Sequence, residues 1–138
     1  MEKYYSKIDT NKLLHIVNRL SSINNKQRIN IIPEDNFIQC SLLKLENNKT
    51  FSPHKHITKS RNYDNQISQE SWLVLDGKIE CTFYDIDDTV LATTVLNKGD
   101  ASFTLYGGHT FKVLQEDTII YEYKTGPYEG QQLDKVLI

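Results

Sequence analysis

The feature that most constrains the fold is a series of short extended runs separated by turn residues. Asp76-Gly77, Asp87-Asp88 and Gly107-Gly108 interrupt runs that are rich in β-branched and aromatic residues, and the Asp-Gly pair predicts a tight hairpin. About eight short strands favour an all-β sandwich or barrel, whose alternating side chains converge on a lumen. We predict strands at residues 37–45, 50–57, 70–75, 78–85, 90–96, 101–106, 109–114 and 118–124.

The start of the chain has a different pattern. Asp9-Thr10-Asn11 offers N-cap residues, and apolar residues follow at helical spacing up to Leu20. We therefore predict one amphipathic helix over residues 10–21. His15 lies off its apolar stripe, so we expect this side chain to face solvent.

Length and charge limit the classes of protein. With 138 residues the chain fits one domain, in which residues 1–36 form the helix and an arm, 37–128 the barrel and 129–138 a tail. The net charge of −2 and the lack of a basic run argue against nucleic acid and anionic membranes as partners. The first residues lack the apolar core of a secretory signal, which favours the cytoplasm. There, Cys40 and Cys81 are expected to be reduced thiols.

Three of the four histidines belong to one pattern. His54 and His56 are two residues apart in a predicted strand, so their side chains share a face. Glu70 and His109 begin two later strands. Three imidazoles and a carboxylate suit a divalent first-row transition metal, whereas a lone His-x-His pair would be an ordinary core or rim feature.

These residues resemble the two motifs of the cupin superfamily. His54-x-His56 and Glu70, with six residues before Gly77, are similar to the first motif, and Gly99 through Gly107-Gly108-His109 is similar to the second. The resemblance implies a double-stranded β-helix, the jelly-roll cupin barrel. It also implies one metal ion held by His54, His56, Glu70 and His109, with Fe, Mn, Ni, Co and Zn all open.

A closer resemblance is to the WbuC-like cupin metalloproteins. It rests on the ending Tyr121 to Tyr128 followed by Asp134-Lys135, and on the Pro53-His54-x-His56 and Gly108-His109-Thr110 contexts. This resemblance implies an accessory protein that is encoded in a gene cluster for surface-polysaccharide biosynthesis. The predicted N-terminal helix or the apolar end 136–138 offers a contact for a homodimer.

Candidates for catalysis and ligand binding lie close to these motifs. Strand alternation places Glu122 and Lys124 on one face and Tyr121 and Tyr123 on the other. A lumen-facing Lys124 would hold a phosphate and Glu122 would move a proton, whereas an outward-facing salt bridge is the alternative. Further candidates are Tyr128 for proton transfer, Lys59 and Arg61 for an anionic ligand, and Trp72, for which the alternative is core packing.

Three functions remain open at this point. The first is a metal-dependent isomerase or epimerase acting on a sugar or sugar nucleotide. The second is an Fe(II)-dependent dioxygenase, which needs two open coordination positions. The third is a non-catalytic carbohydrate-binding or regulatory protein. The family's setting favours the first.

Overall fold

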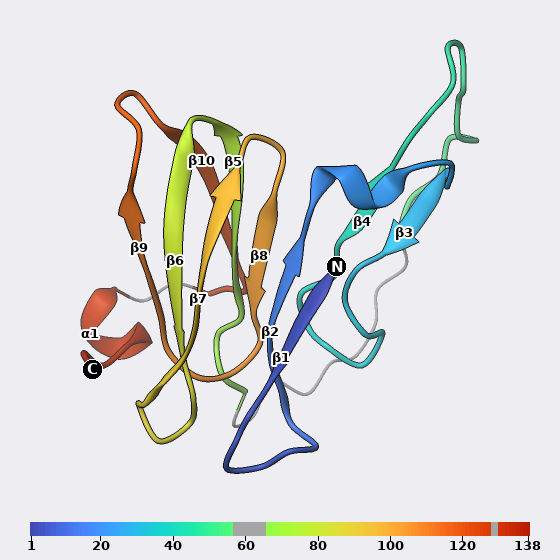
Figure 1. Cartoon of the computed structure of the whole chain (residues 1–138). Helices are drawn as coiled ribbons and strands as arrows, with labels where there is room; N and C mark the ends of the chain where they lie inside the picture. Colours follow the sequence, from blue (N-terminus) through green and yellow to red (C-terminus); the bar gives the residue numbers. More distant parts are fainter. Residues whose placement is uncertain (57–65, 128–129) are drawn as a thin grey trace.

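The computed structural model describes residues 1–56, 66–127 and 130–138, and it is built mostly of antiparallel β-strands (Figure 1). The strands are β1 (Glu2–Tyr5), β2 (Leu13–Asn18), β3 (Arg28–Asn30), β4 (Ser41–Leu43), β5 (Glu70–Asp76), β6 (Lys78–Tyr84), β7 (Val90–Asn97), β8 (Ala101–Thr104), β9 (His109–Val113) and β10 (Ile119–Lys124). A 3₁₀ turn η1 (Leu20–Ile23) and a short helix α1 (Gln131–Asp134) complete the described elements.

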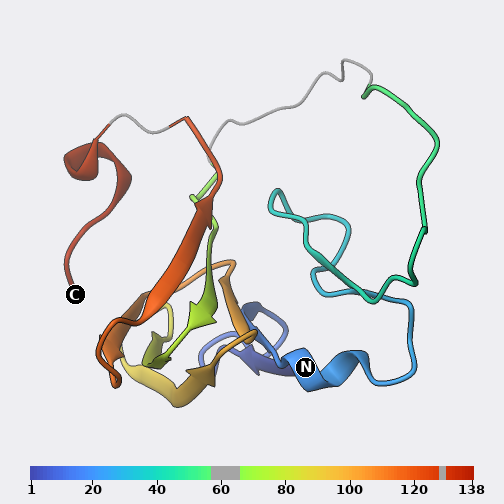
Figure 2. The ribbon, with the colours of Figure 1, turned by 90° about the horizontal axis from the view of Figure 1, so that it is seen from above.

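The strands form three sheets. A five-stranded sheet has the order β1-β2-β8-β5-β10, a three-stranded sheet has the order β7-β6-β9, and β3 pairs with β4. Figure 2 shows β3, β4 and the chain that follows them standing apart on one side, with α1 on the opposite side. From β5 onward the chain crosses between the two larger sheets four times, after β5, β7, β8 and β9.

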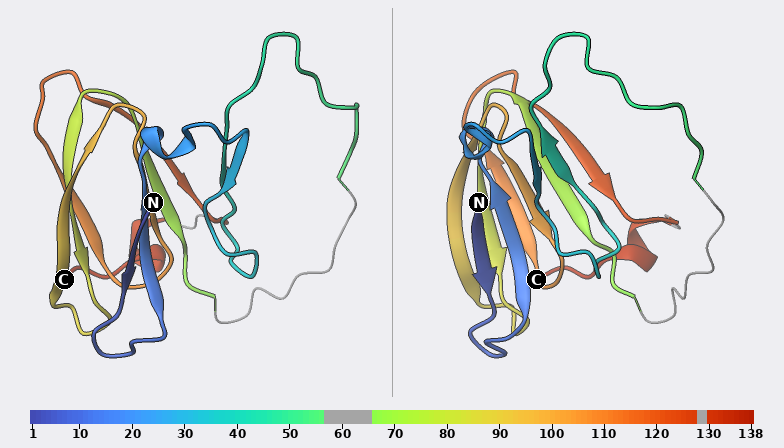
Figure 3. Two further views of the ribbon diagram at one scale, coloured as in Figure 1. Left: turned by 45° about the vertical axis from the view of Figure 1, so that its right-hand side comes forward. Right: turned by 90° about the vertical axis from the view of Figure 1, so that its right-hand side faces the viewer.

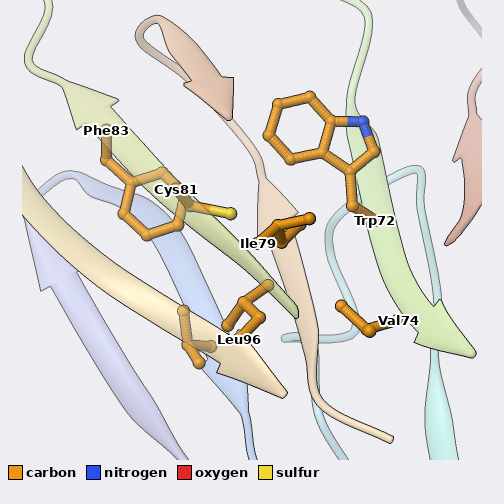
Figure 4. Packing of buried hydrophobic residues seen from close by; sticks show 7 residues of the cluster. Trp72, Val74, Ile79, Cys81, Phe83 and Leu96 are labelled. Atoms are coloured by element: carbon orange, nitrogen blue, oxygen red, sulfur yellow. The ribbon is translucent and has the colours of Figure 1, made fainter. Parts of the chain in front are cut away.

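The main core lies between the two larger sheets. Trp72 and Val74 of β5 meet Ile79, Cys81 and Phe83 of β6 there, as Figure 4 shows together with Leu96. β6 alternates buried and half-buried residues along its length, which is the pattern of a strand with one face on a core. The alternation of apolar residues therefore specifies this interface.

A second core covers the opposite face of the five-stranded sheet. Ile16 of β2 and Phe103 of β8 pack there against Ile31 and Ile32, which follow β3. β8 is buried along its whole length because it is covered on both faces. The layers are thus the β3–β4 pair, the five-stranded sheet and the three-stranded sheet.

The predicted helix over residues 10–21 is wrong. Leu13–Asn18 forms β2, which pairs with β1 and β8. Ile16 belongs to the second core and Val17 to the main core. A continuous apolar run is therefore the pattern of a strand that is buried on both faces. Such a short run also fits helical spacing, and only the neighbouring strands decide between the two.

The predicted Asp76-Gly77 hairpin is also wrong. β5 pairs with β10 and β8, whereas β6 pairs with β7 and β9. Gly77 is therefore a corner that passes the chain from one sheet to the other. Its φ of +82° suits glycine, and a Cβ there would lie 2.8 Å from the Thr118 Cα. By contrast, β6 and β7 do form a hairpin around Asp87-Asp88.

The structure differs most from the prediction at the two strands that were predicted before β5. The strand predicted at residues 37–45 is reduced to Ser41–Leu43, which pairs only with the short β3 among the described residues. Residues 50–56 of the strand predicted at 50–57 form no strand, and their side chains are exposed. Figure 3 shows this segment running outside the sheets. A strand needs a partner for its backbone groups, and this segment has none in the described structure.

In the described part of the chain, no helix is both long and apolar enough to cross a membrane.

Candidate functional site

Glu70 and His109 meet between the two larger sheets. Glu70 is the first residue of β5 and His109 the first residue of β9. The Glu70 Oε1 and His109 Nε2 atoms are 3.5 Å apart, and the two side chains are 11% and 22% exposed. Sequence motifs 39 positions apart are thus brought into contact by the crossing of the chain at Gly107-Gly108.

Trp72 forms the wall behind this pair. It lies two residues after Glu70, so it shares the face of that side chain. Its ring lies 4.3 Å from the His109 ring and 4.9 Å from the Phe111 ring, measured between centroids. Because Trp72 is only 5% exposed, it packs against His109 in this structure and fixes the plane of the imidazole.

Glu122 and Lys124 lie on the same inner face. Glu122 pairs in register with Trp72, and the Trp72 Nε1–H donates to Glu122 Oε2 at 3.3 Å. Lys124 pairs in register with Glu70. Alternation predicted that these two residues share a face, and the register confirms it.

The C-terminal segment joins the site through Lys124. The Lys124 Nζ donates to Asp134 Oδ2 at 2.8 Å, and the Ser68 hydroxyl donates to Asp134 Oδ1 at 3.2 Å. The bond to Lys124 lowers the pKa of Asp134. A ligand phosphate that binds Lys124 would therefore have to compete with this carboxylate. Asp134 was not a candidate in the sequence, since nothing local connects it with Lys124.

The protonation of the pair follows from its surroundings. Burial raises the pKa of Glu70, and the nearby charge of Glu122 raises it further. Burial lowers the pKa of His109 to about 4, and His15 and Lys135 lower it as well. His109 is therefore uncharged at neutral pH, so its contact with Glu70 is not an ion pair.

His15 is a part of the site that the sequence prediction placed wrongly. The predicted exposed histidine is fully buried and stacks on Phe83, with 4.5 Å between ring centroids. Its Nδ1 lies 3.1 Å from Thr104 Oγ1, and Thr104 Oγ1 lies 2.7 Å from His109 Nδ1. Burial lowers the pKa of His15 to about 4. The position of His15 inside an apolar run of strand length was the sequence signal that could have indicated its burial.

The four predicted metal ligands form two separate pairs. His54 and His56 contact each other, with ring centroids 5.5 Å apart, and both are exposed. Glu70 and His109 form the other pair. In residues 1–56, 66–127 and 130–138, no three His, Cys, Asp or Glu side chains are arranged to hold a metal ion. The described arrangement does not fit the four-ligand site, which stays a prediction.

Three other candidates, Lys59, Arg61 and Tyr128, lie outside the described residues.

Glu70 and His109 line neither of two cavities in the described structure. One of about 580 Å³ separates the β3–β4 layer from the outer face of the five-stranded sheet, with Ile31, Leu73 and Phe103 in its wall. Another, of about 780 Å³, lies beside Arg19, whose guanidinium already binds Glu2 and Asp100. Neither cavity is lined by a described carboxyl–imidazole pair, although Lys124 lies in the wall of the first.

The pair lies near the edge formed by β9 and β10. β9 pairs only with β6, and β10 only with β5, within the described structure. On β9, Phe111 and Val113 share the inner face with His109 and are 36% and 50% exposed. The C-terminal segment lies beside this edge, because Asp134 binds Lys124 and a Cβ at Gly108 would meet the Ile138 side chain.

Comparisons of the chain with models of protein families, with curated proteins and with solved structures found no match.

Proposed function

We propose that this protein binds a small polar molecule at the β9–β10 edge and catalyses proton transfer on it, as an isomerase or epimerase of sugars or sugar nucleotides. The observation that carries the proposal is the Glu70–His109 pair. A carboxyl and an uncharged imidazole lie 3.5 Å apart and are partly screened from water. Such a pair can take up and return protons without a redox cofactor.

The proposed reaction is a shift of two hydrogens on a hydroxy-carbonyl unit. The Glu70 carboxylate accepts the proton from the carbon that bears the hydroxyl, and the C–H electron pair forms the C=C bond of an enediol. Glu70 then returns its proton to the former carbonyl carbon. A second proton moves from one oxygen to the other by way of His109. Atoms and electrons balance, because substrate and product are isomers.

The groups around the pair support binding of a polar ligand. Glu122 and Lys124 share the inner face of β10, where they pair in register with Trp72 and Glu70 of β5. The ammonium group of Lys124 can bind the phosphate of a sugar phosphate or sugar nucleotide. In the described structure this group forms an ion pair with Asp134. Each charge-assisted hydrogen bond from such a group contributes about 1.5–3 kcal/mol.

The proposal is tested by exchange of hydrogen with solvent. A panel of nucleotide sugars and sugar phosphates is incubated with the protein in deuterium oxide, and the products are read by mass spectrometry and proton NMR. We expect one member to gain deuterium at the carbon next to its carbonyl. Glu70→Gln should reduce the rate by about 10²–10⁴-fold, which is the usual contribution of a positioned acid–base group.

The matched control is Glu116→Gln, because Glu116 lies exposed in the turn before β10. It should exchange like the unaltered protein. Binding is measured separately by thermal shift, with Asp134→Asn expected to strengthen and Lys124→Ala to weaken the binding of phosphate-bearing compounds. Binding without any exchange would make this protein a non-catalytic sugar-binding protein, and the isomerase proposal would be abandoned.

A further inference from the structure

His15, Thr104 and His109 form a continuous hydrogen-bonded chain, and the far side of the His109 ring faces Glu70. The His15 Nε2 lies 3.1 Å from the Tyr84 carbonyl oxygen, and the His15 Nδ1 lies 3.1 Å from Thr104 Oγ1. The same hydroxyl lies 2.7 Å from His109 Nδ1. The His109 Nε2 then faces Glu70 Oε1.

The carbonyl of Tyr84 fixes where every proton in this chain lies. A carbonyl oxygen can only accept, so His15 must carry its hydrogen on Nε2. An uncharged imidazole has one N–H, which leaves His15 Nδ1 as an acceptor. Thr104 has one hydroxyl hydrogen and donates it to that Nδ1. Thr104 Oγ1 must then accept from His109, so His109 carries its hydrogen on Nδ1.

We propose that His15 and Thr104 are positioning residues that hold His109 in its Nδ1–H tautomer and so direct the Nε2 lone pair towards the ligand. The role of this tautomer in ligand binding rests on the proposed function, but the tautomer itself can be measured without any ligand. Both His109 Nε2 and an ionised Glu70 are then acceptors. The site therefore favours a ligand that brings a donor, such as a sugar hydroxyl, to this pair.

The packing supports a fixed tautomer. His15 is fully buried and stacked on Phe83, while Trp72 covers the ring of His109. Gly107 also leaves room for the chain, since a Cβ at this residue would clash with the Tyr84 carbonyl oxygen that His15 Nε2 faces. Rotation of either ring would break these contacts, so the hydrogen-bond directions are set by the fold.

The tautomer is measured by NMR on protein labelled with ¹⁵N-histidine. The chain has four histidines, so the spectrum has few signals, and His15→Gln and His109→Gln assign the signals of these two rings. We expect His15 to be protonated on Nε2 and His109 on Nδ1. In Thr104→Val, which keeps the shape but loses the hydroxyl, His109 should shift to the Nε2–H form, which can donate to Glu70. Thr104→Ser should restore the original form.

Two results would overturn the inference: a proton on His109 Nε2 in the unaltered protein, or an unchanged tautomer in Thr104→Val. A merely structural Thr104 would lower the melting temperature in Thr104→Val without moving the proton. Addition of glucose 6-phosphate, whose open-chain form carries the hydroxy-carbonyl unit of the proposed reaction, separates this inference from the proposed function. A shift of the His109 Nε2 signal supports both, whereas no shift with the tautomer intact contradicts the function only for this compound and leaves the positioning roles standing.

Discussion

At the scale of single residues, His15 makes the clearest prediction on pH. Burial lowers its pKa to about 4 in the folded protein, although the charge of Asp85 opposes this, whereas a histidine in an unfolded chain titrates near 6.5. As pH falls, the unfolded state binds the proton first. The free energy of unfolding therefore falls between about pH 6.5 and pH 4, by about 3 kcal/mol from this group.

The measurement is urea unfolding at a series of pH values. His15→Gln removes the titrating ring and keeps a side chain that can hydrogen-bond. We expect this variant to be less stable at neutral pH and to lose less stability on acidification. The remaining pH dependence should include His109, whose pKa is also lowered to about 4. An identical pH dependence in both proteins would show that His15 is not buried in its uncharged form.

Residue patterns predicted the face of a side chain better than its burial. Strand alternation correctly put Glu122 and Lys124 on one face, because their strand has a regular period of two. The burial of His15 could not be read in the same way. It depends on Thr104 and on Tyr84, which reach it from strands 89 and 69 positions away in the sequence.

At the scale of elements, Gly77 tests the corner between β5 and β6. We expect Gly77→Ala to destabilise the protein by about 1–3 kcal/mol, since alanine resists a φ of +82° and its Cβ would meet Thr118. Gly130→Ala is the matched control: Gly130 also has positive φ, but no atom of the described residues lies within 4 Å of a Cβ there.

Chemical denaturation compares the two variants. The difference in their free energies of unfolding isolates the clash with Thr118, because both share the backbone penalty. Equal losses would mean that the backbone conformation alone demands glycine at this corner. No loss in either variant would contradict the described corner.

The strands from β5 onward were predicted well, and the elements before β5 were not. From Glu70 to Lys124, turn residues divide the sequence at nearly every strand end, so local chemistry determines the bounds. Before Glu70 the signals are ambiguous. The apolar run of β2 fits a helix or a doubly buried strand, and residues 50–56 look extended without a partner to pair with.

At the scale of the whole molecule, the predicted metal site joins two regions that the described structure keeps apart. Figures 1 and 2 show β9 and the segment before residue 57 on opposite sides of the five-stranded sheet. A single ion held by His54, His56, Glu70 and His109 requires this segment to move. Among the described strands β9 pairs only with β6, so its other edge offers backbone groups with which an extended segment can pair.

The last prediction is therefore that metal binding and the position of this segment are coupled. We expect the protein to bind about one divalent transition metal ion per chain, with His54→Ala and His109→Ala each weakening binding by more than about tenfold. Lys55→Ala is the control, because Lys55 lies between the two histidines but its ammonium group has no lone pair for a metal ion. Metal content by mass spectrometry and spin-label distances from residue 53 to residue 112 measure the two quantities together. A shorter distance on adding metal would show that the segment joins β9. If only one of the two histidine variants loses metal, the pairs act separately, and the site is either exposed at His54–His56 or confined to Glu70–His109.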